Sequence, residues 1–277
     1  MIKPLDYFAA LVQQDDSIPL FEAAVALAQD ADPQLDLGAV QADMDSLAAR
    51  LRKRIPIDAG AVQKVQLLNH YFYRELGFGC NLNNYYDPDN SYLHRVLKTR
   101  RGIPISLAIL HIEMAQQIGL DLKGISFPGH FLMKLSVPSG DIILDPVNGA
   151  SLSREELEDR LEPFVEQIRR AGKPLAGYLE AAPARDILVR MLRNLKSLYL
   201  DQTRWQRLLP VQQRLLILLP GDITERRDRG LAFSNLDCPQ AALEDFQAYL
   251  AQRPYAADAE EVRSKLPMLR LACRKLN

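Results

Sequence analysis

The feature that most restricts the fold of this chain is a repeat of 34 residues in its C-terminal part. Shifting the sequence by 34 positions aligns Tyr199 with Phe233, Leu209 with Leu243, Leu216 with Leu250 and Pro220 with Pro254. This period, with large and small apolar positions and a closing proline, is typical of tetratricopeptide helix pairs. Leu-rich helices with unrelated packing are the alternative. Two repeats and a last helix are few for an independent solenoid, so we expect this tail to pack on the preceding domain.

The region before the repeat begins with helices. Apolar residues recur three and four positions apart within residues 5–54, 61–76 and 91–100, which predicts helices in all three stretches. Gly77 is the expected end of the second stretch, because glycine readily adopts the positive φ of a helix C-terminus. A nearly all-apolar helix is predicted where residues 101–120 follow the turn at Pro104.

The pattern then changes to strands. Residues 122–128, 130–137 and 141–147 are short, rich in branched or alternating apolar residues and separated by Pro and Gly. They predict three strands, of which the last two form a hairpin. Residues 153–171 predict one amphipathic helix that begins with a capping box formed by Ser153 and Glu156. The chain is therefore expected to be α+β over residues 1–180 and all-α over residues 181–277.

Charge is distributed unevenly between the two parts. Up to Glu162 there are 15 Lys and Arg against 22 Asp and Glu, whereas from Pro163 onward there are 19 against 13. This asymmetry supports a chain with two parts. Basic residues in the second part are not clustered with interleaved aromatic residues, so nucleic-acid binding is not expected.

Cysteine content and hydropathy indicate the compartment. Cys80, Cys238 and Cys273 are far apart and lack the spacing of a metal site. No apolar run reaches the roughly 18–20 residues that span a bilayer, and the first residues do not resemble a signal peptide. We therefore expect a cytoplasmic protein with no membrane association, no cofactor and no metal.

Three residues have the chemistry and the order of a catalytic triad. Ser106 lies near the start of the apolar helix, His130 at the start of a strand and Asp145 at the end of the next. A hairpin between the two strands would bring His130 and Asp145 opposite each other on one face. Nucleophilic catalysis needs such a base and orienting group beside the nucleophile.

The sequence around these residues resembles a known family. The runs DPDNSYLHRVLKTRRGIPISLAILHIEMAQQIGL, GISFPGHFLMKL and IILDPVNG are similar to the transglutaminase-like superfamily, over roughly residues 40–265. The closer resemblance is to the bacterial SirB-type branch, which joins this domain to a C-terminal tetratricopeptide (TPR) tail. The resemblance implies a papain-like core, in which a central helix packs on a small antiparallel sheet, and a Cys-His-Asp triad.

The resemblance matches His130 and Asp145 to the triad His and Asp but places Ser106 where active members have Cys. A thiol is partly ionised at pH 7, whereas a serine hydroxyl depends on a well-placed base and an oxyanion hole. Ser106 is therefore interpreted as a helix cap, a degenerate ligand-binding residue or a nucleophile, and His130–Asp145 as a structural or binding pair. Cys80, in the preceding loop, could in principle supply a thiol in place of Ser106, although nothing in the sequence places it near His130.

Further residues are candidates for lining the same cleft. Tyr85, Tyr86 and Asn90 match the family's loop before the helix, with packing as the alternative role. Arg100 and Arg101, with Lys98, could form an anion or carboxylate site at the mouth of the cleft. Solvated charges at a helix C-terminus are the default interpretation of these cations.

The function expected from the sequence is binding. A transglutaminase-like fold without its thiol, joined to a TPR tail, suggests a non-catalytic scaffold or regulator that binds a protein or peptide through the tail or the cleft. The alternative is a serine-variant amide hydrolase or acyltransferase that uses Ser106, His130 and Asp145 on peptide-like substrates. The sequence identifies neither the partner nor the oligomeric state.

Overall fold

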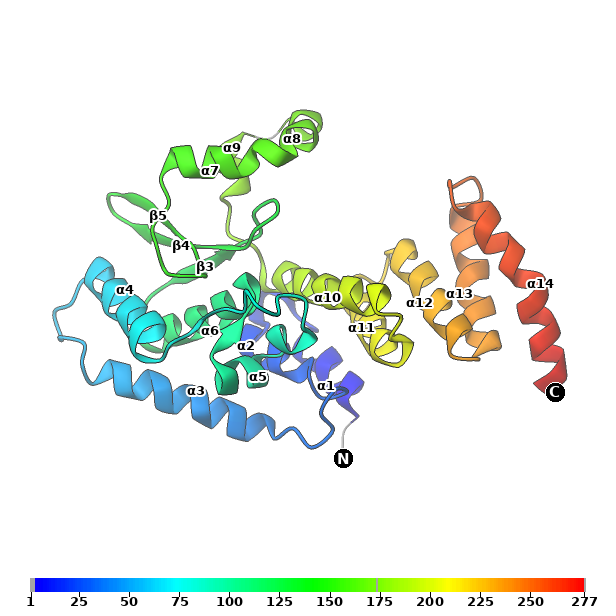
Figure 1. Ribbon diagram of the computed structural model, residues 1–277, viewed down its shortest axis with the longest axis horizontal. Coiled ribbons are helices and arrows are strands. Elements are labelled where there is room, and N and C mark those ends of the chain that lie inside the picture. Colours follow the sequence, from blue (N-terminus) through cyan, green and yellow to red (C-terminus); the bar gives the residue numbers. More distant parts are fainter. Residues whose placement is uncertain (1–2, 173, 277) are drawn as a thin grey trace. The chain divides into compact units, whose positions relative to one another are not determined.

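The computed structural model describes residues 3–172 and 174–276. It confirms the α+β class: helices dominate, and two small sheets lie in the first part of the chain (Figure 1). The chain divides into two compact units. One is Leu11–Met191, and the other combines the N-terminal residues through Ala10 with those from Leu192 onward, so that the boundary falls inside α10 (Ala184–Asp201).

The Leu11–Met191 unit contains most of the elements. Its helices are α2 (Leu20–Ala26), α3 (Leu37–Arg52), α4 (Ala61–Asn69), α5 (Leu93–Thr99), α6 (Pro104–Gln117), α7 (Arg154–Leu161), α8 (Val165–Ala171) and α9 (Leu175–Tyr178). Shorter helical turns are η1 (Asp15–Ser17), η2 (His70–Glu75), η3 (Pro88–Asn90) and η4 (Glu162–Phe164). The strands are β1 (Gly79–Cys80), β2 (Arg101–Gly102), β3 (Leu122–Ile125), β4 (Leu132–Val137) and β5 (Gly140–Leu144).

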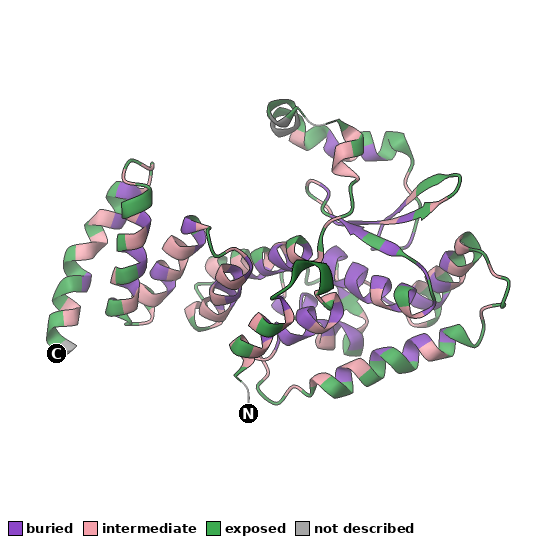
Figure 2. Ribbon diagram, turned by 180° about the vertical axis from the view of Figure 1, so that it is seen from behind, coloured by how far each residue is buried: buried purple, intermediate pink, exposed green. Residues whose placement is uncertain are grey.

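Helix α6 is the centre of this unit. Its apolar sequence is explained by its burial on nearly every side, from Pro104 at the first helical position to Ala115 (Figure 2). It contacts the helices α2, α3, α4 and α5 and the strands β1, β3 and β4. A helix enclosed in this way places its first turn in the interior of the domain.

The three-stranded sheet lies between α6 and a helical layer. Strands β3, β4 and β5 are antiparallel in that order, and the predicted hairpin is confirmed, with Met133 opposite Leu144 and Val137 opposite Gly140. One face contacts α6, whereas the other packs on α7 and α9 (Figure 1). The second interface buries Ile125, Phe127, Leu132, Ile143, Leu157 and Leu161.

The region after the sheet confirms one prediction and corrects another. Ser153 accepts a hydrogen bond from the Glu156 amide while the Glu156 carboxylate accepts one from the Ser153 amide, so the capping box is present. The prediction of one continuous helix over 153–171 is wrong. It is interrupted at η4, where Pro163 lacks the amide hydrogen that an α-helix needs.

The second unit consists of helices. It contains α1 (Pro4–Leu11) up to Ala10, the end of α10, and α11 (Trp205–Leu218), α12 (Ile223–Asn235), α13 (Pro239–Gln252) and α14 (Ala259–Leu276). Contacts join α11 to α12, α12 to α13 and α13 to α14. The 34-residue shift relates α10 and α11 to α12 and α13. Its closing prolines, Pro220 and Pro254, fall just after α11 and α13.

Candidate functional site

His130 and Asp145 meet where the central hairpin joins its flanking loops. His130 follows Gly129, which has a φ of 67°, and precedes β4, whereas Asp145 directly follows β5. Their Nε2 and Oδ1 atoms are 3.2 Å apart. The structure therefore brings together the two residues that the hairpin predicts to be neighbours, with the Asp145 side chain 8% exposed and that of His130 22% exposed.

Asp145 is held as a carboxylate by three donors. Besides His130, the Val147 amide donates to Oδ1 at 2.9 Å and Arg160 Nη2 donates to Oδ2 at 2.8 Å. Burial alone would raise the pKa of Asp145, but the bonds from His130, Val147 and Arg160 together lower it to about 2. Near neutral pH the ionised Asp145 accepts the Nε2 proton of His130, which leaves Nδ1 as the nitrogen that can face a ligand.

Arg190 fixes the loop that presents His130. This α10 residue donates to the carbonyl oxygens of Phe127 at 2.8 Å and His130 at 2.7 Å, and to Ser126 Oγ at 2.9 Å. Burial lowers the pKa of Arg190, and its guanidinium also lies over the Phe131 ring. Arg160 and Arg190 are functional candidates that the sequence does not reveal, because no local motif ties either of them to this hairpin.

A second polar network holds the turn after Asp145 against α4 and η2. The Tyr73 hydroxyl donates to Pro146 O at 3.0 Å, and Asn69 Nδ2 donates to Gly149 O at 2.8 Å. The Asn69 Oδ1 atom is 2.8 Å from Nε2 of His111 on α6, whose pKa burial lowers to about 3. His111 is thus a buried neutral residue that supports the Asp145 turn.

Ser106 is hydrogen-bonded to the backbone of Asn90 and Ile103. It is fully buried at the third position of α6, and its hydroxyl lies 2.6 Å from Asn90 O and 3.0 Å from Ile103 O. The same oxygen accepts a hydrogen bond from the Ile103 amide at 3.0 Å, as a capping residue does. The backbone of Gly102 packs tightly against the Ser106 hydroxyl, since a Cβ added at Gly102 would come within 2.6 Å of Ser106 Oγ. Within residues 3–172 and 174–276, Ser106 has no hydrogen bond to His130.

The predicted cleft residues before α6 have different environments. Asn90 is buried and organises its own loop, donating to Asn84 O and Tyr85 O and accepting from Asn81 Nδ2. Tyr85 and Tyr86 are 43% and 73% exposed and contact each other edge to face. Burial raises the pKa of the Tyr85 phenol, and the charge of Arg190 opposes this effect.

Cys80 lies on β1, which contacts α6. Strand β1 pairs in parallel with β2, so that Cys80 is opposite Gly102. Burial and the negative charge of Asp145 raise the pKa of the Cys80 thiol. A raised pKa keeps the sulfur in its less reactive thiol form.

The two predicted basic residues are used differently. Arg101 donates from Nη1 to Gly77 O at 2.6 Å and to Arg100 O at 2.9 Å, so its guanidinium braces the chain next to β2. Arg100 ends α5 with a positive φ, and its guanidinium lies 4.6 Å from the centre of the Phe78 ring. The Arg101 guanidinium therefore bonds to backbone carbonyls, whereas that of Arg100 packs on an aromatic ring.

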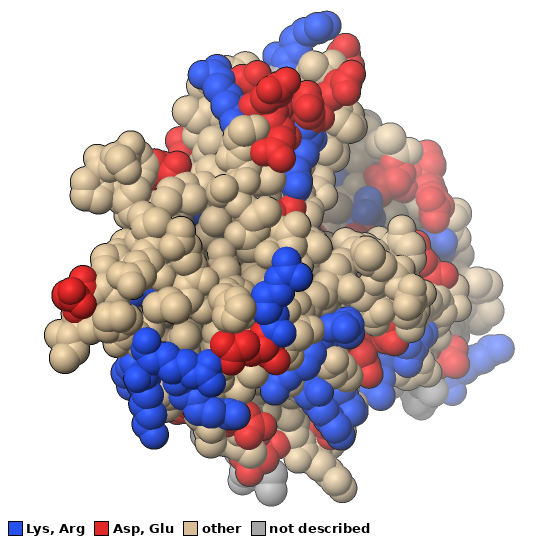
Figure 3. Space-filling view, turned by 60° about the vertical axis from the view of Figure 1, so that its left-hand side comes forward, with Lys and Arg blue, Asp and Glu red and all other residues tan. Residues whose placement is uncertain are grey.

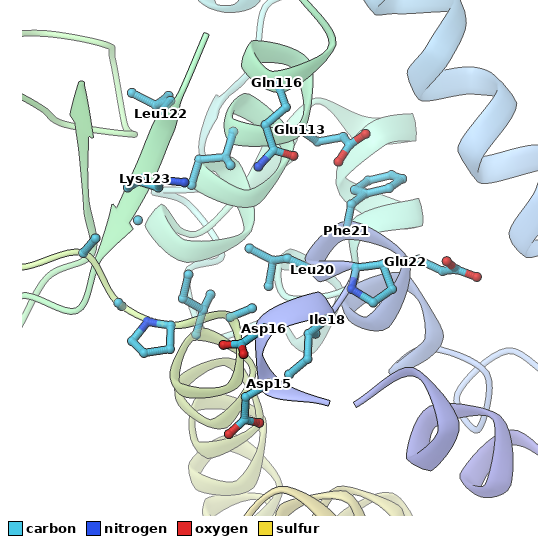
Figure 4. Close-up of a pocket in the computed structure, with 18 of the residues that line it drawn as sticks. Asp15, Asp16, Ile18, Leu20, Phe21, Glu22, Glu113, Gln116, Leu122 and Lys123 are labelled. Atoms are coloured by element: carbon cyan, nitrogen blue, oxygen red, sulfur yellow. The ribbon is translucent and has the colours of Figure 1, made fainter. Parts of the chain in front are cut away.

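A separate cavity of about 610 Å³ opens between η1, α2, α6, β3 and the start of α10. Figure 4 shows acidic side chains around it, including Asp15, Asp16 and Glu22, with Lys123 on the opposite side. Asp15 forms an ion pair with Arg185. Neither His130 nor Asp145 lines this cavity.

Two negative observations apply to the described part of the chain. Residues 3–172 and 174–276 contain no group of three or more His, Cys, Asp or Glu side chains arranged to hold a metal ion. Among the same residues, no helix combines the length and apolar character required to cross a lipid bilayer.

Comparison with protein families agrees with this architecture. Residues 38–193 match the model of the transglutaminase-like superfamily. The chain belongs to this superfamily. Residues 195–267 match a tetratricopeptide repeat model, which confirms the interpretation of the 34-residue period. The first match ends and the second begins within α10.

This chain is similar to proteins called UPF0162 and SirB1. It is 39% identical to a UPF0162 protein of Xylella fastidiosa strain Temecula1, over 91% of this chain and 90% of the relative. A UPF0162 protein of Vibrio cholerae is 30% identical over 92% and 93% of the two chains. The Protein SirB1 of Salmonella typhimurium is 27% identical over 74% and 75%. The predicted SirB-type branch is therefore confirmed. No solved structure matches the chain.

Proposed function

We propose that this protein is a non-catalytic transglutaminase-like protein that acts as a scaffold or regulator by binding a protein or peptide. The observation that carries the proposal is the environment of Ser106. Its hydroxyl is fully buried and engaged with Asn90 and Ile103, so Ser106 does not present its oxygen to the His130–Asp145 pair. The fold keeps His130 beside Asp145, which supports a structural or ligand-binding role for this pair.

The TPR tail supplies the surface that a scaffold needs, since TPR repeats generally mediate protein interactions. A groove of about 530 Å³ runs between α12, the start of α13 and α14. Leu231 and Leu269 give it apolar walls, Met268 is 76% exposed beside it, and Lys265 and Lys275 flank it. We propose that a peptide segment of the partner occupies this groove.

The experiment compares partner recovery by the wild-type chain, His130→Asn and Met268→Glu after crosslinking in cells. The proposal expects His130→Asn to recover the wild-type partners and Met268→Glu to lose them, because a charge in the groove opposes apolar contact. Tyr255→Glu is the matched control, since Tyr255 is a 96% exposed apolar residue of the same tail outside the groove. Equal recovery by all four proteins would contradict a role for the groove.

A serine-variant amide hydrolase remains the second candidate because His130 and Asp145 keep a base-and-carboxylate geometry at 3.2 Å. A fluorophosphonate probe, which reacts with activated serines, separates the two. The scaffold proposal expects no labelling of Ser106. Labelling of Ser106 that His130→Asn abolishes would establish the enzyme instead.

A further inference from the structure

A second pocket, here called the α3–α5 pocket, has a volume of about 340 Å³ and lies apart from His130 and Asp145. It is lined from α3 by Val40, Asp43, Ser46, Leu47 and Arg50, and from α5 and its C-terminal end by His94, Leu97, Lys98 and Arg100. All of these residues belong to the Leu11–Met191 unit. The pocket contains three permanent cations but one carboxylate.

The three cations lack an ion-pair partner within the described part of the chain. Arg50, Lys98 and Arg100 make no ion pair with any residue that the structure describes, and Arg50 makes a single long hydrogen bond of 3.4 Å, to Ser46 O. Neighbouring arginines behave differently, since Arg54 pairs with Glu75. Asp43 is the one carboxylate that lines the pocket with the three cations, so two of the three positive charges are unbalanced and favour an anion.

Arg100 is held in a costly conformation. It has a φ of 60° at the C-terminus of α5, a position that favours glycine or asparagine. Its guanidinium is fixed on the Phe78 ring, and its Nη1 atom is buried without a hydrogen-bond partner. Burial lowers the pKa of Arg100 and the charge of Arg50 adds to this, whereas Tyr71 and Asp43 oppose it. A strained, desolvated and incompletely bonded arginine is more typical of a ligand site than of a stabilising contact.

His94 adds an independent observation. Its side chain is 10% exposed, and both ring nitrogens are buried without a hydrogen-bond partner. Asp32 approaches Nε2 only to 3.8 Å, beyond hydrogen-bond distance. His94 therefore retains unused hydrogen-bonding capacity at the wall of the pocket.

Figure 3 brings the α3 and α4 side of the molecule forward and shows Lys and Arg side chains gathered in its lower part. Solvated charges at the end of α5 would account for Lys98 and Arg100. They do not account for Arg50, which comes from a different helix, or for the buried polar atoms of His94 and Arg100.

We propose that the α3–α5 pocket binds a small organic phosphate. Three cations and Asp43 give the pocket two net positive charges, which a phosphate monoester of nearly two negative charges balances. Two arginine forks suit its oxygens, and the buried side chains of Val40, Leu47 and Leu97 suit an apolar body attached to the phosphate. This inference does not depend on the proposed scaffold function.

Isothermal titration calorimetry of the full chain with phenyl phosphate tests the proposal. We expect saturable one-site binding at low ionic strength that weakens as salt rises, competition by inorganic phosphate, and about tenfold weaker binding of benzoate. Arg50→Gln and Arg100→Gly should each weaken phenyl phosphate binding about tenfold. Because glycine suits the positive φ, Arg100→Gly should keep or raise the urea midpoint of unfolding, so a loss of binding is not unfolding.

Arg95→Gln is the matched control, because Arg95 lies on α5 outside the pocket and pairs with Asp32. It should bind phenyl phosphate within twofold of wild type. Absence of saturable binding to the wild-type chain would overturn the proposal. So would equal affinities of wild type, Arg50→Gln and Arg100→Gly, or equal weakening by Arg95→Gln, which indicates surface charge alone.

Discussion

The hydroxyl of Tyr73 donates a 3.0 Å hydrogen bond to the carbonyl oxygen of Pro146, the residue that follows Asp145. Tyr73 stacks beside His111, and burial followed by the charge of Asp145 raises the pKa of its phenol, so the donor stays protonated. The turn that carries Asp145 is therefore anchored from η2, by a residue that precedes Pro146 by 73 positions. Support of this kind holds a side chain more firmly than its own loop can.

Tyr73→Phe removes this anchor while keeping the ring. Pro146 O then lacks its partner, and we expect the free energy of unfolding to fall by about 1–3 kcal/mol. Urea unfolding followed by circular dichroism measures the change. Tyr255→Phe, at a residue that is 96% exposed, should change stability by less than about 0.5 kcal/mol. Equal stabilities of Tyr73→Phe and wild type would show that the anchor contributes nothing.

Asp145 should make the free energy of unfolding depend on pH in the acidic range. Its folded pKa of about 2 lies below the ordinary value of 3.8, so the folded state favours the ionised form. The resulting stabilisation, roughly 2 kcal/mol, is fully present above about pH 4 and is lost as the pH falls through 4 towards 2. Asp145→Asn should remove that part of the pH dependence of urea unfolding between pH 5 and 2.5. Asp159→Asn, at an exposed position of α7, should keep it.

Local patterns were enough to predict much of the fold. The hairpin follows from alternating residues around Pro138 and Gly140, the start of α7 from the spacing of Ser153 and Glu156, and the tail from its 34-residue period. These signals lie within one element or between neighbouring elements, where the geometry is set by the backbone period.

Contacts between distant segments could not be predicted in this way. Arg160 and Arg190 reach Asp145 and the His130 carbonyl from 15 and 60 residues away, and no spacing rule relates them. The two-residue strands β1 and β2 are too short to show a period. The role of Ser106 depends on Asn90 O, supplied by a loop that tertiary packing places over the start of α6, so the sequence left its three interpretations open.

Ser106→Cys tests whether the nucleophile position is accessible. In a chain whose three native cysteines are replaced by serine, we expect the introduced thiol to resist Ellman's reagent under native conditions, because Ser106 is fully buried against Asn90 and Gly102. The larger sulfur and the loss of a 2.6 Å bond should lower the free energy of unfolding by about 1–3 kcal/mol. Rapid native labelling, against complete labelling in urea as reference, would show an open site and favour the enzyme.

The pKa of the Cys80 thiol should depend on the charge of Asp145. Since the Asp145 carboxylate contributes to the raised pKa of Cys80, Asp145→Asn should lower that pKa. The pH dependence of iodoacetamide alkylation measures it in a Cys238→Ser, Cys273→Ser background, where Cys80 is the remaining thiol. Asp141→Asn, at an exposed carboxylate of β5, should leave the midpoint unchanged. A faster rate with an unshifted midpoint would indicate greater access instead of a charge effect.

Asp245 should be the most sensitive charged residue of the TPR tail. It is 1% exposed, and it accepts bonds from Arg229 at 2.7 and 2.8 Å and from Arg226 at 3.0 Å. Asp245→Asn leaves both arginines without their counter-charge. We expect a loss of about 2–3 kcal/mol, less than for a fully buried pair because Arg226 is 44% exposed. Urea unfolding followed by Trp205 fluorescence measures it in the same unit. Asp237→Asn, at an exposed tail position, should unfold within about 0.5 kcal/mol of wild type, and an equal effect of both variants would contradict the role of Asp245.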